Sequence, residues 1–424
     1  MQPLIIISSY HCMKKSLCLW ILSSVAATSL MAQRTLKPVT IDLFHDTPVL
    51  FDPSLYPDGI VEKERSTYLG NGRIVLKKID LPPFRRYTEA EITLTLASNG
   101  DPWDKAGSCF LISPGAGITM LDIAASKASY PMADTTRYEQ LTGIVQGENY
   151  APAVELMRFM TPFGVGHFSS DADSVSARRR PVYVDGWAQE VTWRQDITDL
   201  LPLLEEGAWV GVFIDTWTKE GYEVDVRFTF TESALRGDRK PKIHVESLIN
   251  TNYYIGQKHP DIFSRQDVEV PFSIPRKARN VRLKYITTGH GGHSGGDEFR
   301  PQKNILSIDG KEVLSFTPWR TDCASFRRFN PTSGVWLQKR TQAFIGRNGK
   351  REMKEIEEPL ASSDLSRSNW CPGSDVPPEE INLQGIAPGS HTLTISIPES
   401  APIDENKLNH WLVSAWLVWE TDSI

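Results

Sequence analysis

Apolar and polar residues alternate one by one along several stretches of this 424-residue chain, most clearly over residues 91–96, 222–230 and 392–397. This period of two is typical of a β-strand with one face in a core and the other in water. Helical periodicity is nearly absent, apart from one or two turns at residues 200–206. Because the strand-like stretches are short and separated by Gly, Pro, Asn and Asp, they predict an all-β protein of antiparallel sandwiches without β-α-β units.

The chain is long enough for two domains, and the 40% of its residues that are hydrophobic suffice for two cores. The best boundary is the charged stretch at residues 233–242. We therefore predict an N-terminal domain at residues 33–236 and a C-terminal domain at residues 241–424. Residues 116–146 are small and polar, and we interpret them as an inserted loop. We interpret the highly charged residues 340–368 as a second insertion or long loop, with a solvated loop at residues 347–358.

The N-terminus has the features of a secretory signal. Two lysines precede a short apolar run at residues 17–27, and small residues then lead to Ala32. We predict a signal peptide at residues 1–32, with Met13 as an alternative start, and export to the periplasm, the cell surface or the medium. An anchor helix is the weaker interpretation, since the apolar run is too short to cross a bilayer.

The charges of the chain limit its partners. The net charge is -6 and both signs are interspersed, whereas a nucleic-acid partner would select a basic face. No stretch after residue 35 approaches the ~20 apolar residues that a membrane-spanning helix needs. We expect a mature chain that is monomeric, has no membrane span and binds no nucleic acid.

Three cysteines follow the predicted signal peptide, Cys109, Cys323 and Cys371. Because the number is odd, at most one intramolecular disulfide forms and one thiol remains. Cys109 lies in an apolar run and is expected to be a buried strand residue. Cys323 and Cys371 have loop-like surroundings, so in an oxidising compartment they are the natural pair.

Two acidic segments follow predicted strands. Residues 99–104 come directly after the strand that ends at Leu96, and they include Asp104. Asp215 ends the apolar run of residues 210–214. A strand end can present a catalytic acid in a fixed position. Each segment also has a purely structural explanation, because Asp and Asn often cap turns.

A glycine-rich segment at residues 288–298 contains His290, His293, Asp297 and Glu298. Its glycines suggest that the backbone packs closely against something, such as a ligand. The histidines and acids could form a metal site, but their spacing is loose and no other His or Cys cluster supports it. We therefore expect no metal ion.

Tryptophans lie near these segments or near the pair Cys323 and Cys371. Aromatic rings can stack on the apolar faces of sugars while nearby carboxylates bind the hydroxyls, although some of these rings are expected simply to fill the ends of the cores. The tryptophans concerned are Trp103, Trp217, Trp319 and Trp370.

Several separated motifs also follow one another in a characteristic order. They are Trp103-Asp104, the hexapeptide at 158–163, Asp215-Thr216-Trp217, Glu298 followed by the strand at 305–309, and Trp370-Cys371-Pro372-Gly373 with Val376-Pro377. In this order they resemble the peptide-N-glycosidase F (PNGase F) family across roughly residues 88–420. The motif that begins at Trp370 is the most specific.

The resemblance implies two antiparallel jelly-roll-like β-sandwich domains packed side by side, with the active cleft between them. Members of this family hydrolyse the amide that joins the core GlcNAc to Asn, leaving Asp and a glycosylamine. They need neither a metal ion nor an organic cofactor. The implied substrates are N-glycosylated proteins or glycopeptides.

The resemblance also assigns site residues. By position, Asp104 matches the principal catalytic acid, and Glu298 and Asp215 match acids that assist it. Arg367 and His290 match a site arginine and a site histidine. The other expected substrate contacts are Trp103, Lys105, Trp217 and Trp370, and a family disulfide matches Cys323 and Cys371.

These residue types suit amide hydrolysis. The reaction needs a base that activates water and a proton for the nitrogen leaving group. Carboxylates in different surroundings can take different pKa values and divide the two tasks. Arg367 is expected to stabilise the developing oxyanion.

Three positions depart from the family pattern. Asp215 replaces the usual Glu, Lys105 replaces an arginine beside the principal acid, and Gly164 replaces an aromatic residue. A shorter acid can be misplaced by about 1 Å, which costs roughly a hundredfold in rate. Asp215 therefore favours, to a limited degree, a different function, namely glycan binding without catalysis on the same fold.

A second alternative is a copper monooxygenase, which can also consist of two sandwiches. That chemistry wants several His or Met ligands on both domains. The predicted N-terminal domain offers only His45 and His167, which disfavours this function.

Overall fold

Strands account for 47% of the protein and helices for 10%, which confirms the all-β prediction. The computed structural model describes residues 37–113, 115–131, 142–147, 149–170, 184, 186–234, 242–257, 261–291, 296–403 and 408–422. The predicted signal peptide, His293 and most of the predicted domain boundary lie outside these residues. The predicted domain limits therefore stay a prediction.

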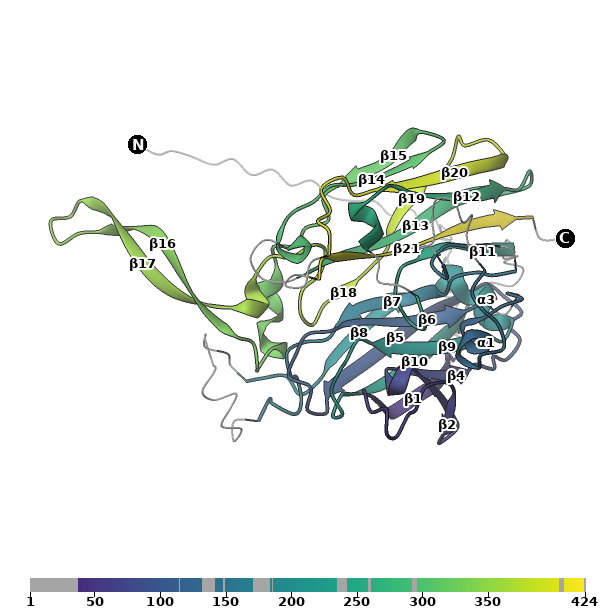
Figure 1. The fold of residues 1–424 in the computed structure, drawn as a ribbon, viewed down its shortest axis with the longest axis horizontal. Coiled ribbons are helices and arrows are strands. Elements are labelled where there is room, and N and C mark those ends of the chain that lie inside the picture. Colours follow the sequence, from purple (N-terminus) through teal and green to yellow (C-terminus); the bar gives the residue numbers. More distant parts are fainter. Residues whose placement is uncertain are drawn as a thin grey trace, which may run out of the picture. The chain divides into compact units, whose positions relative to one another are not determined.

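Two antiparallel sheets form the first sandwich (Figure 1). One sheet has four strands in the order β1 (Val39–Val49), β10 (Tyr222–Glu232), β5 (Thr88–Ser98) and β8 (Val191–Asp196). The other has seven strands in the order β18 (Asp375–Val376), β7 (Val154–Met160), β6 (Ala106–Ile112), β9 (Trp209–Ile214), β4 (Ile74–Lys78), β3 (Ser66–Leu69) and β2 (Val61–Lys63).

The alternating residues of the sequence build the core of this sandwich. In β10, every second side chain from Tyr222 to Phe230 is at most 1% exposed, and so are Ile92, Leu94 and Leu96 of β5. Burial of one such side chain contributes about 1.5–3 kcal/mol. The polar residues between them face away from the core, as the period of two predicts.

The second sandwich also consists of two antiparallel sheets. Their orders are β11 (Lys242–Asn250), β21 (His410–Thr421), β13 (Arg279–His290) and β19 (Glu379–Asn382), and β12 (Val268–Ile274), β20 (Gly389–Ser396), β14 (Asn304–Ile308) and β15 (Lys311–Phe316). Alternating residues such as Leu393 and Ile395 build its separate core.

Within the described residues, helices are few and short. They are α1 (Met120–Ala124) and α3 (Leu201–Glu205), with the 3-10 turns η1 (Gly70–Gly72), η3 (Thr198–Leu200), η4 (Asp261–Ser264), η5 (Asp297–Phe299), η6 (Cys323–Phe329) and η7 (Ser362–Asp364). Helix α3 confirms the predicted turns at residues 200–206. Helix α1 belongs to the expected inserted segment, where Thr119 and Asp122 form a capping box. Among the described residues, none of the helices has the length and hydropathy to span a membrane.

The expectation of a long loop at residues 340–368 is wrong. Strands β16 (Val335–Ile345) and β17 (Arg351–Ala361) form a long hairpin that pairs with no other described strand and projects from the sandwiches (Figure 1). Because the hairpin covers no core, its strands lack the alternation that marks the other strands. Its backbone groups are paired between the two strands, which explains how so charged a segment can be regular.

A buried charged pair on β7 connects the two sandwiches. Glu155 and Arg158 are at most 1% exposed and pair with each other. The Arg158 guanidinium also donates to the Leu412 carbonyl at 2.5 Å and to the Thr288 hydroxyl at 3.3 Å. Asn252 donates to the Glu155 carboxylate at 2.9 Å. The strand motif at 158–163 therefore carries a polar contact between the sandwiches, close to the edge where β18 joins β7.

We expect Arg158→Met to lower the free energy of unfolding by about 3–5 kcal/mol, because Glu155 is left as an uncompensated buried charge. Urea unfolding checks this. The control is Arg194→Met on the exposed face of β8, which should change stability by less than about 0.5 kcal/mol. Equal stabilities for the two variants would contradict the role of the buried pair.

Candidate active site

Asp104 and Asp215 lie at the same end of two neighbouring strands in the seven-stranded sheet. Asp104 comes just before β6 and Asp215 directly after β9, and these antiparallel strands are neighbours. The Asp215 amide donates to the Ala106 carbonyl at 3.0 Å, which continues the ladder beyond the strands. Acids distant in sequence are thus brought together by strand pairing.

The loop that presents Asp104 is held by buried hydrogen bonds. Asp101 is fully buried and accepts from the Thr216 hydroxyl at 2.7 Å and the Trp103 amide at 2.9 Å. Asp101 therefore has the capping role that the sequence suggested for this turn. Gly100 has a φ of +133°, and a Cβ there would approach Glu220 to 2.7 Å, so a side chain cannot be accommodated. These contacts hold the loop in place as far as Trp103, the residue before Asp104.

Arg367 lies between two of the predicted acids. Its side chain is 2% exposed, with Nε 2.8 Å from Glu298 Oε1 and Nη2 3.8 Å from Asp104 Oδ2. Its other donors bond to the Leu365 and Ser362 carbonyls, both at 2.9 Å. The guanidinium is therefore fixed in position and holds the two carboxylates near each other.

Glu298 has an unusual protonation state. Burial raises the pKa of Glu298 to about 7; the Arg367 charge opposes this rise, and the nearby Asp104 carboxylate adds to it. Glu298 therefore carries a proton for a substantial part of the time near neutral pH. The pKa of this carboxyl therefore differs from that of an exposed glutamate, and such a difference allows a carboxyl to act in acid-base chemistry.

Asp215 belongs to a neighbouring cluster that the sequence analysis missed in part. One of its oxygens accepts from Trp217 Nε1 at 3.1 Å and lies 3.4 Å from Arg73 Nη1. The other accepts from the Tyr253 hydroxyl at 2.7 Å. The Arg73 guanidinium also lies over the Trp217 ring, 4.4 Å from its centroid. Both oxygens of the shorter acid are therefore held in place.

Arg73 and Tyr253 carry little signal in the sequence. Arg73 directly precedes β4, which pairs with β9, and its carbonyl accepts from the Ile214 amide at 3.1 Å. Tyr253 follows β11 of the second sandwich. Only the strand pairing and the contact between sandwiches bring these residues to Asp215. An arginine before one strand and a tyrosine after another are too common to single out.

The remaining predicted residues differ in exposure. Trp103 and Trp217 are 56% and 57% exposed, so both rings are accessible to a ligand. His290 and Trp370 are buried and stack with ring centroids 5.4 Å apart. Lys105 lies beside Asp104, and its amide donates to the Thr161 hydroxyl at 2.8 Å.

The predicted disulfide is confirmed. Cys323 and Cys371 are bonded, with Cα atoms 5.1 Å apart, and Cys109 is a buried free thiol. The bond joins η6 to the segment that follows Trp370. The Trp370 indole in turn donates to the Gly289 carbonyl at 2.9 Å. The disulfide and this hydrogen bond thus hold the segment that carries Trp370, three residues after Arg367.

Asp297 has a structural role. It is fully buried and accepts from Gln302 at 2.6 Å, from the Trp411 indole at 3.0 Å and from Ser400 at 3.1 Å. These hydrogen bonds engage both oxygens of the carboxylate that a metal site in the glycine-rich segment would use as a ligand.

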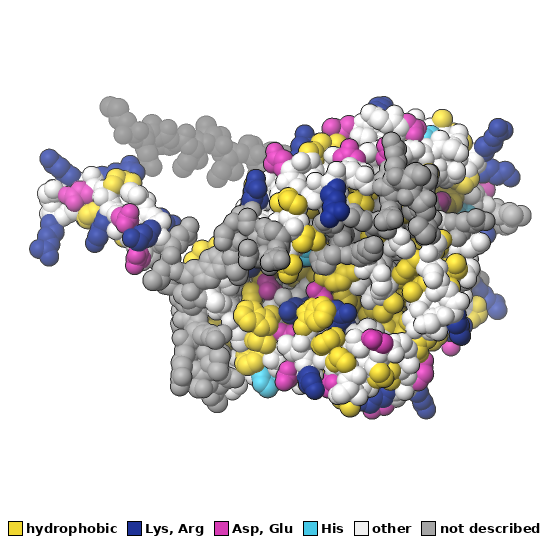
Figure 2. Space-filling view, viewed as in Figure 1, with side chains coloured by type: hydrophobic (Ala, Val, Ile, Leu, Met, Phe, Trp, Pro, Cys, Tyr) yellow, Lys and Arg dark blue, Asp and Glu magenta, His cyan; other side chains and the backbone are white. Residues whose placement is uncertain are grey.

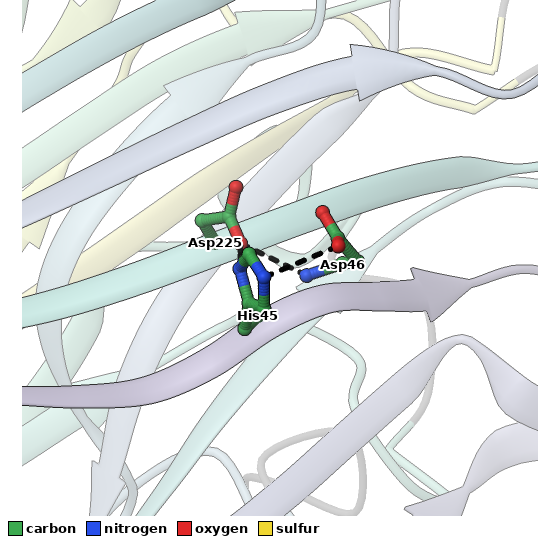
Figure 3. A group of neighbouring side chains, drawn as sticks. All are labelled: His45, Asp46 and Asp225. Atoms are coloured by element: carbon green, nitrogen blue, oxygen red, sulfur yellow. Dashed lines mark hydrogen bonds and ion pairs between the residues drawn. The ribbon is translucent and has the colours of Figure 1, made fainter.

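A separate group in the described residues has the spacing of metal ligands. His45, Asp46 and Asp225 place one ligand atom each within 4.8 Å of the others, on β1 and β10 (Figure 3). The His45 side chain is 79% exposed, and its ring nitrogens lie 3.2 Å from Asp46 Oδ2 and 2.9 Å from Asp225 Oδ1. We assign no function to this exposed group.

Fold and site together define a two-sandwich protein with a buried arginine between carboxylates and exposed tryptophans beside them. Two family models match the sequence: "Peptide-N-glycosidase F, N terminal" over residues 40–230 and "Peptide-N-glycosidase F, C terminal" over residues 258–418. The chain belongs to the peptide-N-glycosidase F family. Among curated proteins, none matches the sequence.

Solved structures agree with this assignment. PNGF-II is 32% identical with a TM-score of 0.75, and the match covers 91% of this chain and 66% of that one. This chain thus spans about two thirds of the length of PNGF-II. PNGase F, a glycosylasparaginase from Flavobacterium meningosepticum, is 14% identical with a TM-score of 0.56, covering 91% and 97%. At that identity the likeness shows the fold alone.

We expect the raised pKa of Glu298 to appear in the pH dependence of stability. Between pH 4.5, the ordinary value, and about 7, the folded state binds more protons than the unfolded state. The free energy of unfolding therefore falls across this window as pH rises, by on the order of 3 kcal/mol from this group. Urea unfolding from pH 4 to 8 should show that Glu298→Gln loses this component.

The matched control is Glu312→Gln, an exposed glutamate on β15. It should keep the pH dependence of the unchanged protein. The same slope in Glu298→Gln as in the control would contradict the assigned pKa.

Proposed function

We propose that the protein hydrolyses the amide bond between the core GlcNAc and the asparagine of N-linked glycans. The products are the released glycan, as a glycosylamine, and an aspartate in the polypeptide. The observation that carries this proposal is Arg367, buried between Asp104 and Glu298 at the end of the sheet. Membership of the peptide-N-glycosidase F family supports the same reaction.

The proposed roles follow from the geometry. Asp104 activates the water that adds to the amide carbon, and the amide nitrogen leaves after it gains a proton. Glu298 has a pKa of about 7, so it can hold that proton near neutral pH. Water supplies the oxygen of the new carboxylate, and its hydrogens end on the leaving nitrogen and in solvent.

Arg367 is proposed as a positioning residue. Its side chain is 2% exposed, and its donors already serve two carbonyls and the acids. A guanidinium so engaged cannot turn towards an oxyanion without breaking these bonds. We therefore propose that Arg367 positions the acids, instead of the expected stabilisation of the oxyanion. It fixes the spacing of Asp104 and Glu298.

The exposed rings and Asp215 are proposed to bind the sugar. Trp103 and Trp217 present apolar faces that suit a pyranose ring, and the Asp215 carboxylate suits its hydroxyls. Asp215 is oriented by Tyr253 and Arg73. The proposed substrates are N-glycosylated proteins or glycopeptides. An exported monomer, as expected from the sequence, is consistent with such substrates.

Glycan binding without catalysis is the second candidate. The observation that favours it is that both oxygens of Asp215, the shorter acid, are engaged by Trp217, Arg73 and Tyr253. Asp104 and Glu298 would then have no chemical task. Deglycosylation of a glycopeptide, followed by mass spectrometry, separates the two functions.

If the protein is an amidase, we expect Asp104→Asn to lower kcat by about 10²–10⁴-fold, because the asparagine side chain of the variant cannot act as the base that activates water. Binding of the glycopeptide should change little. Initial rates with a defined N-glycopeptide, and calorimetry of binding, check both expectations. Asp80→Asn, an exposed aspartate, is the control and should keep full activity. Full turnover by Asp104→Asn would refute this role.

For sugar binding, we expect Asp215→Ala to weaken glycopeptide affinity by about tenfold or more, the value of one or two charge-assisted hydrogen bonds. Titration calorimetry checks this even if turnover is slow. Asp80→Ala serves as the control. Unchanged affinity in Asp215→Ala would remove this residue from the sugar site under either candidate function.

A further inference from the structure

The hairpin of β16 and β17 exposes large hydrophobic side chains. Ile345 is 70% exposed, Met353 59% and Phe344 41%. The strand register places Ala343 opposite Met353 and Ile345 opposite Arg351. Ala343, Ile345 and Met353 therefore share one face near the tip, while Phe344 lies on the other face. The described strands include no partner sheet that covers either face.

Basic side chains gather around the same tip. Between residues 344 and 354 there are four basic residues, Arg347, Lys350, Arg351 and Lys354, against one acid, Glu352. All five are exposed. Figure 2 shows the hairpin with its basic, acidic and hydrophobic side chains beyond the rest of the described surface. This basic tip belongs to a chain whose net charge is -6.

The stem of the hairpin has a different charge pattern. Lys339 lies 3.7 Å from Glu355 and 3.6 Å from Glu357, so its charge is compensated within the hairpin. No such ion pair forms at Arg347 or Lys350 among the described residues. The excess positive charge is therefore confined to the end that carries Ile345 and Met353.

Apolar side chains surrounded by lysine and arginine fit one kind of partner. The apolar groups gain by leaving water for the acyl boundary of a membrane, and the basic groups are attracted to anionic headgroups. We propose that the tip of this hairpin, residues 343–354, docks onto an anionic lipid surface. The proposal does not depend on the proposed reaction, because lipid binding is measured without a glycan.

The test uses the chain from Gln33, which contains the whole compact unit Leu36–Ile424. The predicted signal peptide is itself basic and apolar and would obscure the result. The probe is vesicles of equal parts phosphatidylglycerol and phosphatidylcholine, compared with phosphatidylcholine alone. Binding is measured by co-sedimentation at about 0.15 M salt and again at about 0.5 M, where exposed charges are screened.

We expect binding to the anionic vesicles only, and weaker binding at the higher salt concentration. The triple variant Arg347→Gln/Lys350→Gln/Arg351→Gln should lower the partition coefficient by about tenfold or more. Its matched control removes three exposed charges from the second sandwich, in Arg276→Gln/Lys277→Gln/Lys311→Gln. This control should bind as the unchanged protein does.

The apolar part of the surface has its own pair of variants. Ile345→Ser/Met353→Ser should also lower the partition coefficient by about tenfold or more, since two apolar side chains no longer enter the lipid. Leu55→Ser/Ile60→Ser, two exposed apolar residues on the first sandwich, is the control and should bind normally. All four side chains are exposed, so thermal unfolding should show intact folding.

Three results would overturn the proposal: no binding to anionic vesicles, equal binding to both kinds of vesicle, or equal losses in the tip variants and their controls. Sedimentation velocity tests whether a second copy of the chain, instead of lipid, binds the hairpin tip. A dimer that dissociates in Ile345→Ser/Met353→Ser, without lipid binding, would assign the tip to a second copy of the chain and also overturn the proposal.

Discussion

The site depends on one buried charge, the guanidinium of Arg367. Removing an arginine from water costs several kcal/mol unless its charge and its donors are compensated. Here the Asp104 carboxylate, joined by the Glu298 carboxylate when it is ionised, compensates the charge, and the carbonyls of Leu365 and Ser362 take further donors. Burial raises the pKa of Glu298 to about 7, although the Arg367 charge opposes this rise.

The fold supplies this arrangement from both halves of the chain. Pairing of β6 with β9 brings Asp104 and Asp215 together at one end of the first sandwich. Glu298 comes from the turn η5 and Arg367 from the segment that leads to Cys371, which is bonded to Cys323. Strand β18, which follows Cys371, pairs with β7 of the first sandwich. The buried pair of Glu155 and Arg158 connects the sandwiches through the Leu412 carbonyl and Asn252.

The sequence predicted the parts that depend on local patterns. Alternation predicted the core strands, and the family motifs brought together Asp104, Glu298 and Arg367. Arg73 and Tyr253 could not be predicted, because they reach Asp215 only through strand pairing and contact between the sandwiches. The charge of residues 340–368 predicts a loop, whereas much of this segment belongs to the hairpin of β16 and β17, because a ribbon that covers no core has no alternation to detect.

The most direct test of the central claim is mass spectrometry of an N-glycopeptide treated with the protein in oxygen-18 water. The account predicts that the glycosylated Asn becomes Asp carrying one heavy oxygen, with the intact glycan released. If one GlcNAc stays on Asn, the bond that breaks lies between sugars. Either that result, or an unchanged glycopeptide that still binds, would contradict amide hydrolysis by Asp104 and Glu298.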